Sequence, residues 1–454
     1  MGLSVIIMLI EALLCNVMLQ PTADTDVGAI EMVLLVVNFF VLIISVFRSI
    51  GDKEDEQTIK YMIIASLLLR LGILFWDIYC RGIFVLPNSE GDAVWYKSAA
   101  RSYAFYSKSG QYDYDEYSFY IGQLYRLIGI QEITAQYLNV YFAIFSIVLV
   151  YKILTLFQVS TKNKKTAIAL ACFLPNSLMI MTFFLQESII AFCIILSLYL
   201  YTKWWFTRRI VYFILAFIPS LLGSFLHSGS IVPIVAIVAT FAFVSNNEHK
   251  LRITVLAAIG AAIITAVIFM YISSNSGTLF AKIGGTLSAD SVVQHAGLTD
   301  KVTEADYFIG IKGLPSTLDL IVNSPIRMLY FLASPVPWMW RGINDIVAFF
   351  GSSIFYIIAF WNAIKLIRHR NGIDKENGMW AYFFVLFIMI LFATFMFGWG
   401  VSNSGTALRH REKFTYIFII LYVFIKEMTE RARKINNEES VSDSSRLQRG
   451  EVSA

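Results

Sequence analysis

Two carboxylates, Glu90 and Asp92, flank a glycine just before a run of aromatic and basic residues that includes Tyr96. An aspartate in such a position suits a general base, which accepts a proton from a substrate hydroxyl. It equally suits the N-cap of a helix running to about Lys108, with the aromatic side chains forming a belt at a membrane surface. Both interpretations of Asp92 remain open on the residues alone.

Tyrosines and carboxylates alternate in the following segment, which contains Tyr112, Asp113 and Tyr114. This mixture suits a sugar, because a ring packs on the apolar face of the sugar while carboxylates accept hydrogen bonds from its hydroxyls. Glu90, Tyr96, Tyr112 and Tyr114 are therefore candidate substrate-binding residues. An interfacial belt of aromatic residues is the alternative interpretation.

The densest group of cations is Arg409, His410 and Arg411, which follows a loop rich in glycine and serine at 398–408. We expect a helix to begin at these residues. A helix N-terminus carrying two guanidinium groups is suited to phosphate oxygens. The predicted ligand is a lipid-linked phosphate or diphosphate, with ordinary lipid headgroups as the alternative. Arg341, beside a proline-containing segment, is a further candidate substrate-binding residue.

Two other ionisable residues lie at expected turns between apolar segments. Glu187 is a candidate catalytic carboxylate, although an acid also favours the N-terminus of an ordinary helix. His227 is a candidate for orienting substrate hydroxyls, although a lone histidine there also suits a structural role. No metal site and no cofactor are predicted, and metal dependence stays open because no compact carboxylate cluster demands an ion.

The elements that position these residues must be membrane helices. The 454 residues are 57% hydrophobic and only 15% charged, whereas soluble domains are about 45–50% apolar and about 25% charged. This excludes a soluble globular or disordered chain and predicts an all-α polytopic membrane protein. Twelve apolar runs suit a hydrocarbon core about 30 Å thick: 3–20, 29–47, 61–79, 134–157, 166–184, 187–206, 210–226, 228–244, 253–273, 346–367, 379–398 and 409–426.

Lysine and arginine concentrate in alternate loops, which the positive-inside rule assigns to the cytoplasm. The alternation requires the proline-broken segment 326–341 to be re-entrant or interfacial, and it then places both termini in the cytoplasm. Residues 1–426 form a single transmembrane domain in this prediction, and the charged tail 427–454 is disordered. Two long outer loops, 80–133 and 274–345, carry juxtamembrane helices, and the candidate site residues lie on that outer side.

At these residues the chain resembles the GT-C superfamily of membrane glycosyltransferases. The similarity runs diffusely over 60–245, where Gly91-Asp92-Ala93 followed by Tyr96 looks like the aspartate-bearing start of the family's outer loop. The segments Gly405–Arg411 and Ser334–Trp338 look more like bacterial capsule and O-antigen proteins, including their polymerases. The resemblance implies sugar transfer with inversion from a polyprenyl-phosphate-linked donor, with Asp92 as the base, in cell-surface polysaccharide biosynthesis.

Two other functions compete with a glycosyltransferase. A repeat-unit polymerase would use the same lipid diphosphate leaving group. A flippase or transporter of lipid-linked oligosaccharides would also suit twelve spans, but transporters place binding residues near the membrane midplane, whereas these polar residues gather at one face. The expected partners are a lipid-linked sugar donor, a glycan or lipid-linked acceptor and membrane lipids, with no nucleic acid. The expected location is the cell membrane.

Overall fold

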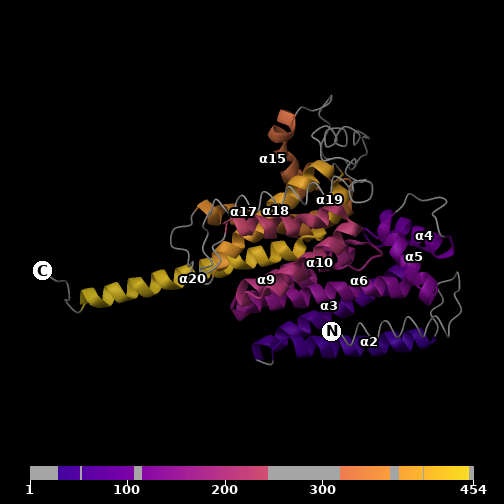
Figure 1. Ribbon diagram of the computed structural model, residues 1–454, viewed down its shortest axis with the longest axis horizontal. Coiled ribbons are helices and arrows are strands. Elements are labelled where there is room, and N and C mark those ends of the chain that lie inside the picture. The colour runs from indigo at the N-terminus through magenta and orange to yellow at the C-terminus, as the bar shows by residue number, and fades with distance from the viewer. Residues whose placement is uncertain are drawn as a thin grey trace.

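The computed structural model describes residues 29–51, 54–106, 115–243, 317–368, 378–401 and 403–448. Every element in these ranges is helical and none is a β-strand, which confirms the predicted all-α class. Most of the longer helices run along the long axis of the molecule, and α20 projects from one end (Figure 1). Helices α4 and α5 lie at the opposite end, which we call the α4–α5 end.

The helices differ widely in length. The longer ones are α2 (Ala29–Ser49), α3 (Glu54–Tyr79), α6 (Glu132–Leu156), α9 (Glu187–Thr207), α10 (Ile210–Leu226), α15 (Thr317–Ala333), α17 (Ile354–Arg368), α18 (Met379–Gly400) and α20 (Thr415–Gln448). The shorter ones are α4 (Asp92–Phe105), α5 (Glu116–Ile128), α7 (Thr161–Phe173), α8 (Pro175–Ile180), α11 (Val232–Phe243), α16 (Ile343–Ala348) and α19 (Ser404–Glu412). Two 3-10 turns, Ser228–Ile231 and Pro337–Met339, and a π-helical turn, Phe349–Ser353, complete the described elements.

Several helices are compatible with a membrane-embedded protein. Five helical stretches among the described residues are long and apolar enough to cross a membrane: Glu56–Tyr79, Glu132–Leu156, Glu187–Thr207, Ile343–Arg368 and Met379–Gly398. The apolar stretches Leu35–Ser49 and Ile210–Leu226 are shorter. Large apolar side chains on α2, α3 and α10 are exposed, as contact with hydrocarbon requires. Two of the twelve expected spans, 3–20 and 253–273, lie outside the described residues.

Two expected spans are interrupted in the structure. The run 166–184 divides into α7 and α8 at Pro175, because proline has no N–H to continue the first helix. The run 409–426 divides between α19 and α20. The amide of Asn176 in α8 donates to the Ala348 carbonyl at 2.9 Å and to Ser352 Oγ at 2.8 Å. These bonds join the first interruption to the π-helical turn.

Helix α6 lies at the centre of the bundle and contacts α3, α7 and α9. In its most apolar stretch 78% of the residues are buried, against 33% for α3, so α3 is peripheral. The charge in the middle of α3, Arg70, faces inward, and its Nη1 donates to the carbonyls of Ser177 and Leu178. A buried guanidinium that binds backbone carbonyls is the arrangement expected of a cation within an apolar bundle.

The charged tail differs from its prediction. Disorder was expected from residue 427 onward, but α20 continues as a helix to Gln448. Glu427 Oε2 accepts hydrogen bonds from Asn163 Nδ2 and Ser160 Oγ, each at 2.7 Å. These bonds attach α20 to the start of α7 and stabilise the turns that follow the apolar part of α20.

Candidate functional site

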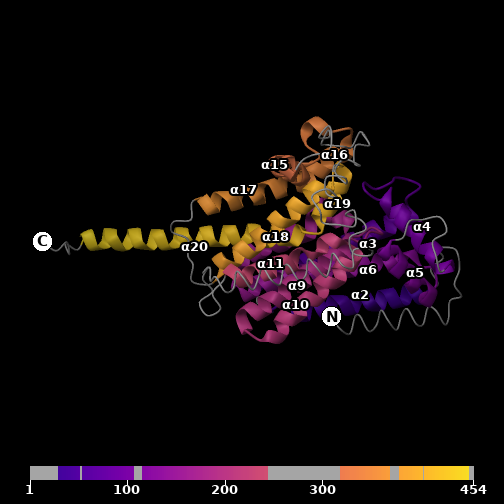
Figure 2. The ribbon, with the colours of Figure 1, turned by 45° about the horizontal axis from the view of Figure 1, so that its top comes forward.

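Three residues that are far apart in the sequence meet at the α4–α5 end. Arg409 contacts the Asp92 carboxylate through Nη1. Its Nε and Nη2 lie 3.3 and 3.2 Å from Oε1 of Glu187. Helix α19, which carries Arg409, lies toward this end of the bundle in both views (Figures 1 and 2). One guanidinium thus links α19 to the first residues of α4 and α9, and we call these three residues the Arg409 cluster.

The two carboxylates of the Arg409 cluster differ in exposure. The Asp92 side chain is 60% exposed and the Glu187 side chain is fully buried. Oε2 of Glu187 is buried without a hydrogen-bond partner among the described residues. Asp92 is therefore the carboxylate that an incoming molecule can reach. Glu187 contacts the same guanidinium from the buried side of the site.

A second cation and two histidines extend the cluster. Lys413 Nζ lies 3.9 Å from Glu187 Oε1 and 2.7 Å from His410 Nδ1. The His410 ring lies 4.8 Å from the His227 ring, and both pack against Phe397. The structure therefore brings together His227 and His410, which were predicted separately. Lys413 was not predicted, although its position four residues after Arg409 places both cations on one helical face.

Tyr96 forms the aromatic wall of the site. Its hydroxyl accepts a hydrogen bond from Gln186 Nε2 at 3.0 Å, and its ring lies 6.0 Å from the Arg409 guanidinium. Burial, and then the nearby Glu187 carboxylate, raise the pKa of Tyr96 above its ordinary value. The hydroxyl is therefore protonated at neutral pH and is able to donate a hydrogen bond.

A buried amide fixes the turn that presents Glu187. Asn139 Nδ2 donates to the carbonyls of Phe183 and Leu185 at 2.6 and 2.9 Å. Ser188 Oγ in turn donates to the Asn139 carbonyl at 2.6 Å. No role for Asn139 was predicted, and the signal for it was an amide inside the apolar run 134–157, where a polar group must find a partner.

The predicted start of the helix at Arg409 is wrong. The Asn403 side chain accepts hydrogen bonds from the backbone N–H groups of Gly405 and Thr406, so α19 begins at Ser404. Arg409 therefore lies in the last turn of α19, where the helix dipole favours cations. Burial lowers the pKa of Arg409 to about 10, so the side chain is a cation at neutral pH. Any affinity of Arg409 for phosphate must come from its guanidinium and not from a helix N-terminus.

Asp92 occupies the first helical position of α4 and is not its N-cap. The cap is Gly91, whose φ of 62° lies in the left-handed region that glycine adopts without strain. Helix α4 ends at Phe105, and Lys108, to which it was expected to run, lies outside the described residues.

Arg411 has different partners from Arg409. It is fully buried and donates to the carbonyls of Phe331, Leu332 and Ser334 at 2.8, 2.7 and 2.6 Å. Residues two apart on a helix do not share a face, which is why the two arginines diverge. Arg411 holds the C-terminal end of α15 against α19.

The remaining candidates lie outside the Arg409 cluster. Arg341 forms a local ion pair with Asp345 at 2.8 Å, and Glu90 is exposed. Tyr112 and Tyr114 lie outside the described residues. Within the described ranges, no group of three or more histidine, cysteine, aspartate or glutamate residues is arranged to hold a metal ion.

Comparisons with known proteins add no relative. No protein family, no curated protein and no solved structure matches this chain.

Proposed function

We propose that this protein is a membrane glycosyltransferase of the GT-C type, which transfers a sugar from a polyprenyl-phosphate-linked donor to a glycan or lipid-linked acceptor. The observation that supports it is the Arg409 cluster, in which a partly buried cation joins an exposed carboxylate to a buried one. Arg409 offers a binding site for an anion, and Asp92, which contacts Arg409, offers a proton acceptor.

The proposed reaction begins when the donor phosphate replaces Asp92 at the Arg409 guanidinium. The released Asp92 carboxylate accepts the proton of the acceptor hydroxyl. The acceptor oxygen bonds to the anomeric carbon of the sugar from the face opposite the phosphate, so the configuration inverts. The bond from that carbon to the phosphate oxygen breaks, and its electron pair stays on the lipid phosphate. Arg409 and Lys413 neutralise the charge that develops there.

The other residues of the site have positioning roles in this proposal. Glu187 is buried and orients Arg409, so it acts through the guanidinium and does not take the proton. Tyr96, His227 and His410 bind hydroxyl groups of the sugar or the acceptor. Arg411 binds no substrate, since it is fully buried and both of its Nη groups donate to carbonyls of the chain and to Ser353.

We also propose a membrane topology for the chain. The chain crosses the cell membrane twelve times, with both termini in the cytoplasm and the loops 80–133 and 274–345 outside. The α4–α5 end then faces outward, and the Arg409 cluster lies at the outer surface. Five stretches suited to crossing a membrane support the polytopic part of this proposal.

Glycan assembly in cells tests the proposal. In a deletion strain complemented with Asp92→Asn or Arg409→Ala, we expect the surface glycan to be lost and its lipid-linked acceptor to accumulate. Complementation with Arg126→Ala, which removes an exposed arginine of α5, should restore the glycan. A wild-type glycan with both site variants would refute the proposal. Accumulation of single complete repeat units would instead identify a polymerase.

A further inference from the structure

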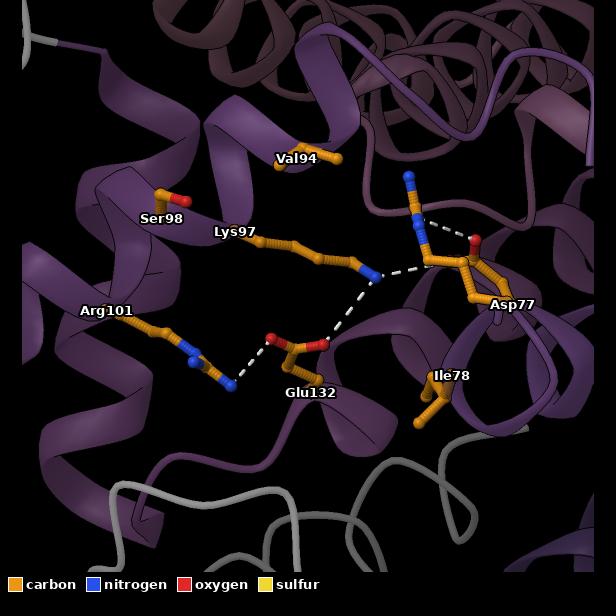
Figure 3. A pocket seen from close by; sticks show the side chains of 8 residues that line it. Asp77, Ile78, Val94, Lys97, Ser98, Arg101 and Glu132 are labelled. Atoms are coloured by element: carbon orange, nitrogen blue, oxygen red, sulfur yellow. Dashed lines mark hydrogen bonds and ion pairs between the residues drawn. The ribbon is translucent and has the colours of Figure 1, made fainter. Parts of the chain in front are cut away.

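A pocket lies on the opposite face of α4 from Asp92 and Tyr96. It has a volume of about 230 Å³, and the side chains that form it are drawn in Figure 3. They come from the end of α3, from α4 and from the start of α6: Asp77, Ile78, Arg81, Val94, Lys97, Ser98, Arg101 and Glu132. We call it the charged pocket.

Helical spacing separates the charged pocket from the Arg409 cluster. Asp92 and Tyr96 are four residues apart and share one face of α4, whereas Lys97 and Arg101 share another. The charged pocket is therefore a site of its own and not an extension of the Arg409 cluster.

Cations outnumber carboxylates in the charged pocket. Lys97 extends between Asp77 and Glu132, with Nζ 3.2 and 3.6 Å from their oxygens (Figure 3). Arg101 Nη2 lies 2.9 Å from Glu132 and Arg81 Nη1 lies 3.2 Å from Asp77. Three cations thus share two carboxylates, and the pocket carries a net positive charge.

The carboxylates are already occupied, whereas the guanidinium groups have donors to spare. Asp77 Oδ2 also accepts a hydrogen bond from Gln136 at 2.8 Å. Nε of Arg101 is buried and has no hydrogen-bond partner among the described residues. The side chains of Arg81 and Arg101 are 28% and 37% exposed, so each guanidinium is accessible to an anion that enters the pocket. An arginine fork matches the oxygens of phosphate.

We propose that the charged pocket binds a single phosphate group. Its volume is below the range of about 300–1,000 Å³ that is usual for larger ligands, so it suits one tetrahedral anion with its waters and not an oligosaccharide. The phosphate comes either from an anionic lipid headgroup or from free phosphate. In both cases it would bridge α4 and the turn that follows α3, which carry Lys97, Arg101 and Arg81, and so stiffen the segment that carries Asp92.

Thermal unfolding of the purified protein in a neutral detergent tests the inference. The probes are inorganic phosphate and dihexanoyl phosphatidylglycerol, each compared with sodium chloride at equal ionic strength. A ligand that binds only the folded state raises the melting temperature in a saturable way. Stabilisation by inorganic phosphate identifies free phosphate as a ligand, and stabilisation by the lipid alone identifies the headgroup. The absence of both effects in the wild-type protein would overturn the inference, whatever the variants do.

Variants localise the effect. The double substitution Arg81→Gln with Arg101→Gln should weaken the apparent affinity by tenfold or more, because charge-assisted hydrogen bonds are lost. Ser98→Phe keeps every charge but fills the pocket, and it should have a similar effect. Arg126→Gln, an exposed arginine of the neighbouring helix α5, should retain the affinity of the wild-type protein.

Arg409→Ala distinguishes this pocket from the proposed transferase site. We expect it to bind the probe as the wild-type protein does, even though it is inactive. An affinity lost in Arg409→Ala but kept in Ser98→Phe would place the phosphate at the Arg409 cluster and overturn the inference. Loss of transferase activity alone would leave the phosphate measurement intact.

Discussion

At the scale of single residues, the division of labour within the Arg409 cluster follows from exposure. Asp92 is reached from outside, whereas Glu187 is enclosed with Arg409 and Lys413. A buried carboxylate without a cation would carry a large desolvation cost, so Glu187 depends on these two residues. The cations are in turn held where a phosphate would bind. This dependence predicts different consequences for the two acids.

Asp92→Asn should reduce sugar transfer by about 10²–10⁴-fold, the usual contribution of a general base. The amide keeps the size of the side chain but cannot take the proton. It also pairs less strongly with the Arg409 guanidinium that the donor phosphate must reach, so donor binding should not weaken. Arg126→Ala is the control, because Arg126 is an exposed residue of the neighbouring helix α5. Rates of product formation at saturating donor check this, and an equal loss in both variants would contradict the role of Asp92.

The two arginines of α19 should separate activity from stability. Arg409→Ala removes the charge that stabilises the leaving phosphate and should reduce transfer by about 10²–10³-fold. Its melting temperature should change less than that of Arg411→Ala. Activity per folded molecule and thermal unfolding, measured on the same preparations, check this. Activity lost in Arg411→Ala at full stability would assign that residue to the site instead.

At the scale of elements, hydrogen bonds from Arg411 hold α15 and α19 together. Arg411→Met should destabilise the protein by about 3 kcal/mol or more, since it leaves three buried carbonyls and Ser353 without their charged donor. Chemical unfolding in detergent measures this. Arg341→Met is the comparison, because its exposed ion pair should contribute less than about 1 kcal/mol. Equal losses would show that α19 is held in another way.

The stability of the contact between α7 and α20 should depend on pH. Partial burial raises the pKa of Glu427, but hydrogen bonds from Asn163 and Ser160 lower it by more, and the net pKa lies below the ordinary value of 4.5. The carboxylate therefore stabilises the folded state fully at neutral pH. This stabilisation is lost as the pH falls below 4.5 and through the lowered pKa of the folded state.

Glu427→Gln should therefore lower the melting temperature at pH 7, and its difference from the wild-type protein should shrink as the solution is acidified through that window. Glu90→Gln, at an exposed position, controls for general effects of acid. A difference that grows at acidic pH would contradict the assignment.

At the scale of the whole molecule, the helical class and the ends of several helices follow from composition and periodicity. Apolar runs such as 134–157 and 187–206 correspond closely to α6 and α9. The interrupted runs were missed because hydropathy does not register a break made by Pro175 or by the turn at Lys413 and Phe414 between α19 and α20. The partners of Arg411 could not be predicted either, since they lie on α15, about 80 residues away in the chain.

Most residues of the candidate site could be predicted from the sequence, whereas their chemical roles could not. Scarcity of charge singled out Asp92, Glu187 and Arg409, which the structure places in contact. Lys413 escaped notice because it lies inside the expected span 409–426.

The proposed topology predicts opposite accessibility for the two ends of the bundle. In a chain carrying Cys15→Ser and Cys80→Ser, a membrane-impermeant maleimide should label Gly82→Cys in intact cells. It should label Arg433→Cys only after the membrane is permeabilised. Both positions are exposed, so access to the reagent depends on the side of the membrane. The reverse pattern would place the Arg409 cluster on the cytoplasmic side and contradict the proposal.

The most direct measurement of the proposed function is transfer by the purified protein in lipid vesicles. The donors are polyprenyl-phosphate-linked sugars extracted from membranes of the native host, supplied with that host's lipid-linked acceptors. We predict that the wild-type protein lengthens an acceptor by one sugar, with inversion, and releases polyprenyl phosphate in equal amount. Asp92→Asn should form neither product, while Arg126→Ala forms both. Donor consumption by Asp92→Asn at the wild-type rate, or movement of intact donor across the bilayer without product, would contradict a glycosyltransferase at the Arg409 cluster.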